Sequence, residues 1–179
     1  MTNKGILWRE IIGYLLDLYI GALFATLPIS LYTYCETGIM SQDITQFTSV
    51  QQITLLISKI IILVIYYILM PIKITKFSTI GERIMGLQID SPSISKFILR
   101  QLIFIIFMAS GAGVICEIFK AVTAINIAGY INMFVLYASL ASMGFLLFTK
   151  QHCMLHDRLF STRVIQKTQE KKEGVQVYD

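Results

Sequence analysis

An acidic side chain, Asp17, lies within the first long apolar stretch of the chain. Five residues recur there at every fourth position: Arg9, Gly13, Asp17, Gly21 and Ala25. On an α-helix they form one ridge, and the small residues on it let another helix approach closely. A carboxyl group at that depth in a membrane must be paired, protonated or exposed to water. Asp17 is therefore a candidate proton or cation site, and equally a candidate for a structural ion pair or a hydrogen bond between helices.

Other polar residues of the apolar stretches are candidate partners of Asp17. Lys59 differs from it in estimated depth by roughly 7 Å, at about 1.5 Å per residue. The lysine side chain allows a buried pair with Asp17, and it also allows extension to the outer lipid headgroups. We expect Arg9 to extend to the inner headgroups or to meet Asp157, and Asn132 and Ser139 could supply oxygen atoms. The candidate polar site comprises Arg9, Asp17, Lys59, Arg100 and Asp157.

No enzyme motif accompanies these residues. The chain has no phosphate-binding glycine loop, no nucleophile elbow and no zinc-protease helix motif. His152 and His156 are four residues apart and could face one metal on a helix, with Cys153 or Asp157 as a further ligand. Cys153 points off that face, however, and neighbouring basic residues add positive charge. We therefore predict a structural segment here, no metal site, no cofactor and no enzymatic activity.

The composition predicts a membrane protein. Of the 179 residues, 55% are hydrophobic and 15% are charged, and the mean hydropathy is +0.68. A helix needs about 20 apolar residues to cross a bilayer, and four stretches have that length: residues 8–34, 53–72, 97–119 and 125–148. We predict an all-α fold, a polytopic four-helix transmembrane bundle that forms one domain over residues 1–166. A charged cytoplasmic tail at 167–179 follows and is expected to be disordered.

The distribution of charge predicts the orientation. Basic residues concentrate in the connection between the second and third stretches and in the tail, whereas the other two connections carry mainly acidic residues. The positive-inside rule then places both termini in the cytoplasm. The net charge of +4 indicates contact with anionic lipid at that face, and no aromatic or helical pattern suggests nucleic-acid binding. Cys35 and Cys116 fall near the outer face, where free thiols are favoured over a disulfide.

Two cytoplasmic segments are alike and indicate an internal repeat. Residues 82–89 match residues 157–164 in character, and residues 7–12 match residues 98–103. A capping box at residues 79–82 predicts a short amphipathic helix in the membrane interface. Halves of equal topology predict a parallel repeat about an axis along the membrane normal. Asp17 breaks the symmetry, because Met108 occupies its position in the second half. Gly111, Ala112 and Gly113 mark either a packing contact or a weak point in the third helix.

These residues resemble the RDD family of small bacterial membrane proteins, which is named for one arginine and two aspartates. Arg9 and Asp17 match the first two of these, and Asp157 matches the third. The stretches TIGERIMGLQI (79–89) and HDRLFSTRVI (156–165) are also similar, and the resemblance covers residues 7–165. The sequence departs from the family pattern at Glu82, where a basic residue is common, and at residues 160–161, where small residues are common. The resemblance implies a multi-pass protein of the bacterial cytoplasmic membrane.

The resemblance also implies two classes of function. Ligand or ion transport has been proposed for the family, with some members linked to cation/proton exchange, and other members look like accessory or self-protection proteins. We therefore expect this protein to bind or transport a small solute or cation at a site around Asp17. Four helices enclose little volume, so a transporter of this size would be a homodimer. The alternative is a non-enzymatic accessory or immunity protein that acts through contacts with a membrane partner.

Overall fold

The computed structural model describes residues 3–123, 125–148 and 154–166, so the predicted tail and the pair His152 and Cys153 lie outside the described residues. Helices make up most of the described chain. They are α1 (Asn3–Thr37), α2 (Ser49–Val64), the π-helix η1 (Ile65–Leu69), α3 (Met70–Lys73), α4 (Ile80–Ile84), α5 (Ile94–Phe107), α6 (Gly111–Thr123), α7 (Ala128–Phe148) and α8 (Leu155–Phe160). Two short strands, β1 (Leu87–Asp90) and β2 (Arg163–Gln166), complete it.

Three helical segments are long and apolar enough to cross a membrane: Leu7–Thr37, Ser49–Lys73 and Ala128–Leu147. The pair α5 and α6 is apolar enough to make a fourth crossing, but the two helices are bent by 65° at a short break. The stretch predicted as the third span is thus interrupted between Phe107 and Gly111. The structure confirms a mostly helical protein with three or four candidate membrane spans.

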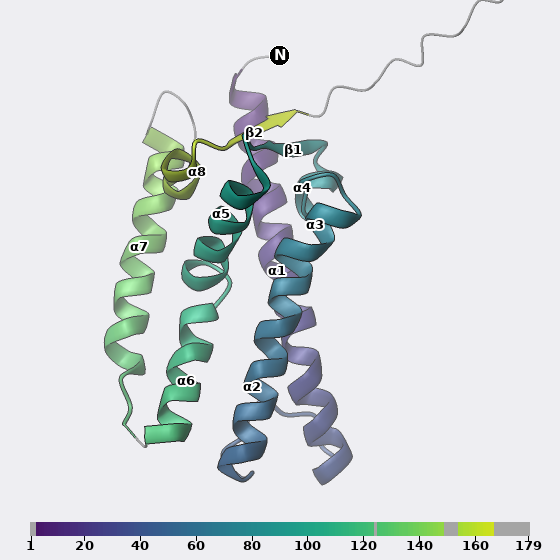
Figure 1. Cartoon of the computed structure of the whole chain (residues 1–179), viewed down its shortest axis with the longest axis vertical. Helices are drawn as coiled ribbons and strands as arrows, with labels where there is room; N and C mark the ends of the chain where they lie inside the picture. Colours follow the sequence, from purple (N-terminus) through teal and green to yellow (C-terminus); the bar gives the residue numbers. More distant parts are fainter. Residues whose placement is uncertain (1–2, 124, 149–153, 167–179) are drawn as a thin grey trace, which may run out of the picture.

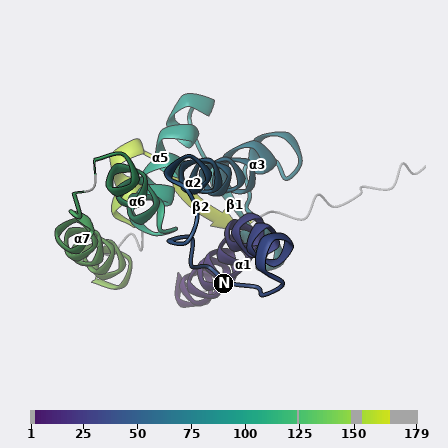
Figure 2. The same ribbon diagram turned by 90° about the horizontal axis from the view of Figure 1, so that it is seen from below.

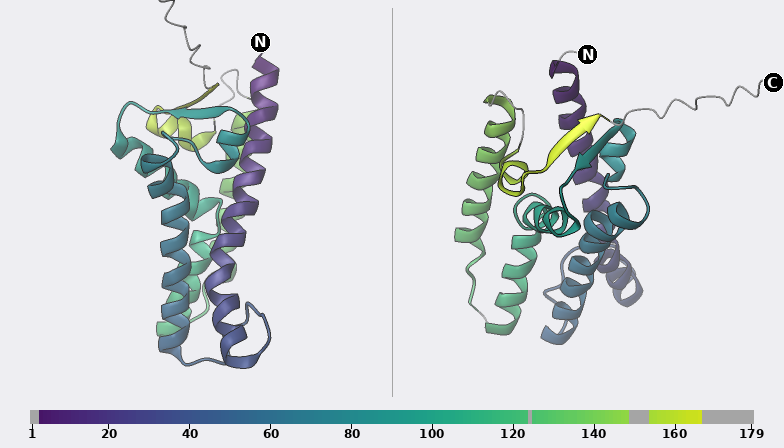
Figure 3. Two further views of the ribbon diagram at one scale, coloured as in Figure 1. Left: turned by 90° about the vertical axis from the view of Figure 1, so that its right-hand side faces the viewer. Right: turned by 45° about the horizontal axis from the view of Figure 1, so that its top comes forward.

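The spans stand side by side (Figures 1 and 2). Helix α1 packs on α2, α2 packs on α6, and α6 packs on α7 at the edge of the molecule. The start of α1, the short helices α4 and α8 and both strands gather at one end, which we call the strand end (Figure 3). The connection from α1 to α2 and the first turn of α7 lie at the opposite end, which we call the loop end.

The break between α5 and α6 has a local cause at Gly111. A Cβ atom on Gly111 would lie 2.6 Å from the main-chain oxygen of Ile105, so no other residue fits without movement of the backbone. The preceding Ser110 has a left-handed backbone, with φ of +65°. The glycine-rich stretch is therefore a weak point in the third span, which is one of the two outcomes that the sequence allowed.

The two repeated segments share one local structure. In the first, α4 ends before Gly86, whose φ is +70°, and β1 follows. In the second, α8 ends before Ser161, whose φ is +55°, and β2 follows. Gly86 and Ser161 occupy equivalent positions of the predicted repeat, so both halves change from helix to strand through the same left-handed turn.

The described chain is mostly helical, in agreement with the all-α prediction, and the two short strands form a small ribbon beside the helices. The strands pair antiparallel, with Ile89 opposite Val164, which are equivalent residues of the repeat. A local pseudo-twofold axis of this two-stranded ribbon therefore passes between these two residues. Leu87 and Ile89 are buried, whereas Asp90 is exposed, which is the period-two pattern of a half-buried strand. Four residues are too few for this alternation to stand out in a sequence.

An aromatic core occupies the strand-end half of the bundle. The rings of Tyr66 and Tyr67 meet edge to face, with centroids 4.7 Å apart. The ring of Phe104 lies 5.0 Å from Tyr67 and 5.1 Å from Tyr14. These contacts join α1, η1 and α5 and fix the positions of the polar groups beside them. Cys35, which is exposed, and Cys116, which is buried, are both free.

Candidate functional site

Asp17 is buried where α1, η1 and α4 meet, with 3% of its surface exposed. Its Oδ1 atom accepts hydrogen bonds from the Tyr66 hydroxyl and from the main-chain N–H of Gly81, both at 2.8 Å. Its Oδ2 atom accepts a hydrogen bond from the hydroxyl of Thr79. Hydrogen bonds to a carboxylate are among the stronger ones in proteins. Asp17 therefore ties three segments of the chain together at the strand end.

The π-helix η1 supplies two neighbouring phenols to this site. Besides the bond from Tyr66, the Tyr67 hydroxyl donates to the main-chain oxygen of Asp17 at 2.8 Å. Tyr67 reaches α1 because Gly21 has no side chain, since a Cβ atom there would lie 2.4 Å from the Tyr67 hydroxyl. Single turns of π-helix are common at functional sites. Here the π-turn delivers both hydroxyls to one residue of α1.

The small residues of the α1 ridge allow a close approach, as the sequence predicted. A Cβ atom on Gly81 would lie 2.2 Å from the main-chain oxygen of Gly13 and 2.8 Å from Cγ of Asp17. The helix that approaches α1 at Gly13 is the short helix α4. The N-cap Thr79 and the capping-box residue Glu82 start α4 as predicted. The Asp17 carboxylate therefore faces the first turn of this helix.

A second buried ionic group lies beside the first. Arg100 is 4% exposed, and its Nε atom lies 2.5 Å from Oδ1 of Asp157. One of its terminal nitrogens lies 3.9 Å from Oε1 of Glu82. Glu82 and Asp157 are equivalent residues of the two repeated segments, so a single arginine contacts both. The Thr162 hydroxyl also donates to Oδ1 of Asp157, at 3.0 Å.

Buried carboxyl groups outnumber the buried cation in this region. Glu10, on α1, is 7% exposed and lies within electrostatic range of Arg100, Asp157 and Glu82. Among the residues that the structure describes, Arg100 is the cation in contact with these acids. We call four residues the acidic cluster: Glu10, Asp17, Glu82 and Asp157.

Burial and nearby charge set the protonation states at the strand end. Burial raises the pKa of Glu82 to about 7, against the opposing effect of Arg100. Burial lowers the pKa of His156 to about 4, so its imidazole is neutral at pH 7. For Asp157, burial is the largest single effect and acts to raise the pKa. The charge of Arg100, the neighbouring His156 and the hydrogen bonds from Arg100 and Thr162 together outweigh burial and hold the pKa below its usual value. At neutral pH, Asp157 is therefore charged and Glu82 is close to its titration point.

Several buried polar atoms in this region have no hydrogen-bond partner in the described part of the chain. They are Nε2 of His156, Oδ2 of Asp157, the hydroxyl of Tyr14 and Nε2 of Gln101. The first two lie 3.9 Å apart, which is too long for a hydrogen bond. Unpaired buried groups carry a desolvation cost of about 1–3 kcal/mol each. The polar interior at the strand end is thus incompletely satisfied, unlike the site around Asp17.

The burial of His156 predicts a pH-dependent loss of stability. Because its pKa falls from about 6.5 in the unfolded chain to about 4 in the fold, stability is lost as the pH drops through that interval. Replacing His156 with Asn removes the titrating group.

Between pH 7 and pH 5 we expect the free energy of unfolding of this variant to fall by roughly 2 kcal/mol less than that of the parent. Thermal unfolding in detergent measures this difference. Glu82→Gln is a control whose effect on the pH dependence of stability is opposite. The raised pKa of Glu82 makes the stability of the parent fall as the pH rises, and this variant removes that contribution. A parallel pH profile for His156→Asn and the parent protein would contradict the assignment.

The structure brings together part of the candidate site predicted from the sequence. Asp157 pairs with Arg100, so the expected alternative contact between Arg9 and Asp157 is wrong. Arg9 is half-buried and makes no ion pair within 4.0 Å among the described residues. Lys59 likewise forms no ion pair with Asp17 and lines two cavities nearer the loop end. Of the two expected oxygen donors on α7, Asn132 is exposed, and Ser139 donates its hydroxyl to the main-chain oxygen of Phe107.

Several site residues did not stand out in the sequence. The sequence spacing could have identified Glu10 as a site residue. Glu10, Tyr14 and Asp17 are spaced by four and three residues and therefore share one face of α1. No sequence pattern identified Tyr66 and Tyr67 of η1 as site residues, because consecutive tyrosines in an apolar stretch are typical of a lipid-facing or core helix. Glu82 was recognised as a capping residue, but its contact with Arg100 depends on the packing of α4 near α5.

A sequence model of the RDD family matches residues 5–161. The chain belongs to the RDD family. Searches of curated proteins and of solved structures gave no match. The match includes Arg9, Asp17 and Asp157, the three residues that correspond to the arginine and the two aspartates of the family name. In this RDD protein Asp17 accepts hydrogen bonds from hydroxyl and amide donors. Asp157 pairs with Arg100 and not with Arg9.

Proposed function

We propose that this RDD protein binds or transports a small cation or other small solute without enzymatic chemistry, and that the acidic cluster exchanges protons during the process. The excess of buried carboxyl groups over Arg100 supports this proposal. Carboxylates buried without a counter-charge are strongly unfavourable, so the cluster must carry protons or a cation. The pKa of Glu82, near 7, makes such an exchange accessible at neutral pH.

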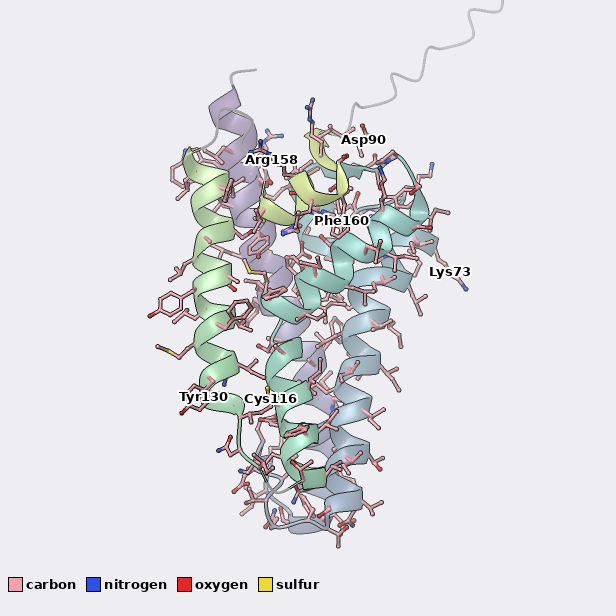
Figure 4. All side chains as sticks on the ribbon, turned by 60° about the vertical axis from the view of Figure 1, so that its left-hand side comes forward. Lys73, Asp90, Cys116, Tyr130, Arg158 and Phe160 are labelled. Atoms are coloured by element: carbon pink, nitrogen blue, oxygen red, sulfur yellow. The ribbon has the colours of Figure 1, made fainter. Side chains whose placement is uncertain are left out.

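We further propose that the strand end faces the cytoplasm of a bacterial cell and contacts anionic lipid. Exposed basic residues at this end support the orientation through the positive-inside rule. Lys73 and Arg158 both lie near the strand end, and Lys73 projects away from the bundle (Figure 4). The exposed basic residues there are Lys73, Lys76, Arg83, Lys96, Arg158 and Arg163. The four predicted crossings, with α5 and α6 together as one, then place both termini inside.

The proposal is tested by the flux of protons and monovalent cations in proteoliposomes. Asp17→Asn removes the negative charge at the centre of the site, and we expect flux driven by a Na⁺ or K⁺ gradient to fall to background. A pH-sensitive dye inside the vesicles reports the coupled proton movement. Intact flux in a folded, inserted Asp17→Asn protein would overturn the proposal.

Two further variants make this test specific. Asp43→Asn removes an acid of the exposed connection between α1 and α2, and we expect its flux to equal that of the parent. Glu10→Gln removes another acid of the cluster. No side-chain hydrogen bond of Glu10 is found among the described residues, so this change disturbs the fold less than Asp17→Asn. We expect reduced flux and a shifted pH dependence for Glu10→Gln. An unchanged pH dependence would exclude the cluster from the pathway.

A second candidate function is contact with a partner protein in the membrane, as an accessory or immunity protein or as a homodimer. The exposure of α7 favours it: only 11% of its span is buried, and Tyr130, Phe134 and Tyr137 form an exposed aromatic face. Tyr130 projects away from the bundle (Figure 4). This function predicts no flux. It also predicts site-specific crosslinking from position 134 to one membrane protein or to a second copy, and loss of protection against a membrane-active peptide when the gene is deleted.

A further inference from the structure

Two cavities meet at Lys59 in the loop-end half of the bundle. One has a volume of about 580 Å³ and lies beside the connection between α1 and α2. The other has a volume of about 270 Å³ and extends deeper, to the break between α5 and α6. Lys59 lines both, so the cavities adjoin at its side chain. Seen from the loop end, α1 and α6 lie on opposite sides of α2 (Figure 2), which carries Lys59. We call the two cavities together the Lys59 groove.

The charges that line the groove differ between its two parts. The larger cavity is lined by two acids and two bases: Asp43, Glu117, Lys59 and Lys120. These charges balance, and Asp43 already accepts two hydrogen bonds from Thr45. Among the described residues that line the deeper cavity, Lys59 is the charged one, so that cavity is positive. An anionic group is therefore favoured at the junction of the two cavities.

Lys59 forms no ion pair with the described part of the chain. No described carboxylate lies within 4.0 Å of its ammonium group. Lys59 is ten residues into the span that starts at Ser49, which is about 15 Å along a helix at 1.5 Å per residue. An unpaired lysine at such a depth is unfavourable unless water or an anion reaches it. The groove gives an anion that access.

The rest of the deeper cavity selects the body of the ligand. Ala22, Ala25 and Ala109 line it with small apolar side chains, and Met108 adds a flexible one. Ser110 lines it as well and contributes a hydroxyl that can donate a hydrogen bond. We propose that the Lys59 groove binds an amphiphilic anion, with its carboxylate or phosphate on Lys59 and its apolar chain among the alanines. This inference stands whether or not the acidic cluster carries ions.

Binding is tested with octanoate on the protein in phosphatidylcholine nanodiscs, by titration calorimetry. We expect saturable binding that Lys59→Gln weakens at least about tenfold and that Lys59→Arg retains. Lys73→Gln is the matched control, since Lys73 is an exposed lysine at the strand end, and it should bind octanoate like the parent. Octanol and octylammonium carry the same chain without the negative charge, and we expect both to bind the parent protein more weakly.

A second arm distinguishes a lipid from a free carboxylate. The protein is extracted from a mixture of phosphatidylglycerol and phosphatidylcholine, and the retained lipids are counted by native mass spectrometry. Phosphatidylglycerol retained by the parent and by Lys59→Arg, but lost from Lys59→Gln, would identify an anionic lipid as the ligand even without octanoate binding. The proposal is overturned if Lys59→Gln changes neither octanoate binding nor lipid retention. It is also overturned if octylammonium binds the parent protein as tightly as octanoate, a result that needs no variant to fold.

Discussion

Replacing Arg100 with Gln is expected to destabilise the protein by about 3–5 kcal/mol. The substitution removes the guanidinium that contacts Asp157 at 2.5 Å and Glu82 at 3.9 Å, and Glu10 loses a nearby positive charge. Three acids would then share a buried site without a cation. Thermal unfolding in detergent measures the loss, and raising the proton concentration should restore part of it by neutralising Glu82.

Matched variants separate the buried pair from a general effect of charge. Arg83 and Arg158 are arginines of the same end of the molecule, but both are exposed. Surface charges contribute little to stability, about 0–1 kcal/mol, so Arg83→Gln and Arg158→Gln should unfold like the parent. The double variant Arg100→Met with Asp157→Leu removes both charges together and should recover part of the loss. Equal stability of Arg100→Gln and Arg83→Gln would show that the buried arginine does not hold the two repeated segments.

Replacing Gly81 with Ala is expected to produce the second large effect. The added Cβ atom would lie 2.2 Å from the main-chain oxygen of Gly13, so α4 has to move away from α1. That movement breaks the hydrogen bond from the Gly81 amide to Asp17, which is 2.8 Å long in the parent. We expect a loss of about 3 kcal/mol, at the upper end for overpacking, or failure of the variant to accumulate in membranes.

Gly144→Ala is the control for this substitution. Gly144 lies in α7, and a Cβ atom there would meet nothing within 4 Å. Alanine is the better helix former by about 1 kcal/mol, so this variant should be as stable as the parent or slightly more stable. If Gly81→Ala unfolded at the same temperature as Gly144→Ala, the close crossing of α1 and α4 would be disproved.

The membrane architecture could be predicted from the sequence because it depends on long apolar stretches. The existence of three long apolar helices follows from hydropathy, although their ends differ from the predicted ones by up to four residues. The α4 capping box follows from Thr79 and Glu82. The break at Gly111 could be suspected from three small residues in a row. Whether those residues pack closely or end a helix depends on the oxygen of Ile105, which only the folded chain places beside them.

The candidate site was harder to predict, because its partners come from distant parts of the chain. Asp17 stood out as an acid in an apolar stretch, yet its donors lie 49 to 64 residues further along. Arg9 and Arg100 are equivalent in the repeat, and nothing in their own neighbourhoods indicates which of them meets Asp157. The choice depends on α8 packing against α5, which is a tertiary contact. The sequence therefore identified polar residues of the interior but did not identify Arg100 as the partner of Asp157.

Two copies of a half-length chain could close the same ribbon that β1 and β2 form. Because the local pseudo-twofold axis passes between Ile89 and Val164, a strand of this kind can pair with an identical strand across a dimer axis. In such a homodimer both subunits have the same sequence, so every substitution would occur in both. The two subunits would therefore always carry the same charges. Duplication and fusion into one chain would remove that constraint. One half could then acquire Asp17 where the other has Met108, and one arginine could bind both acids while the other became free to change.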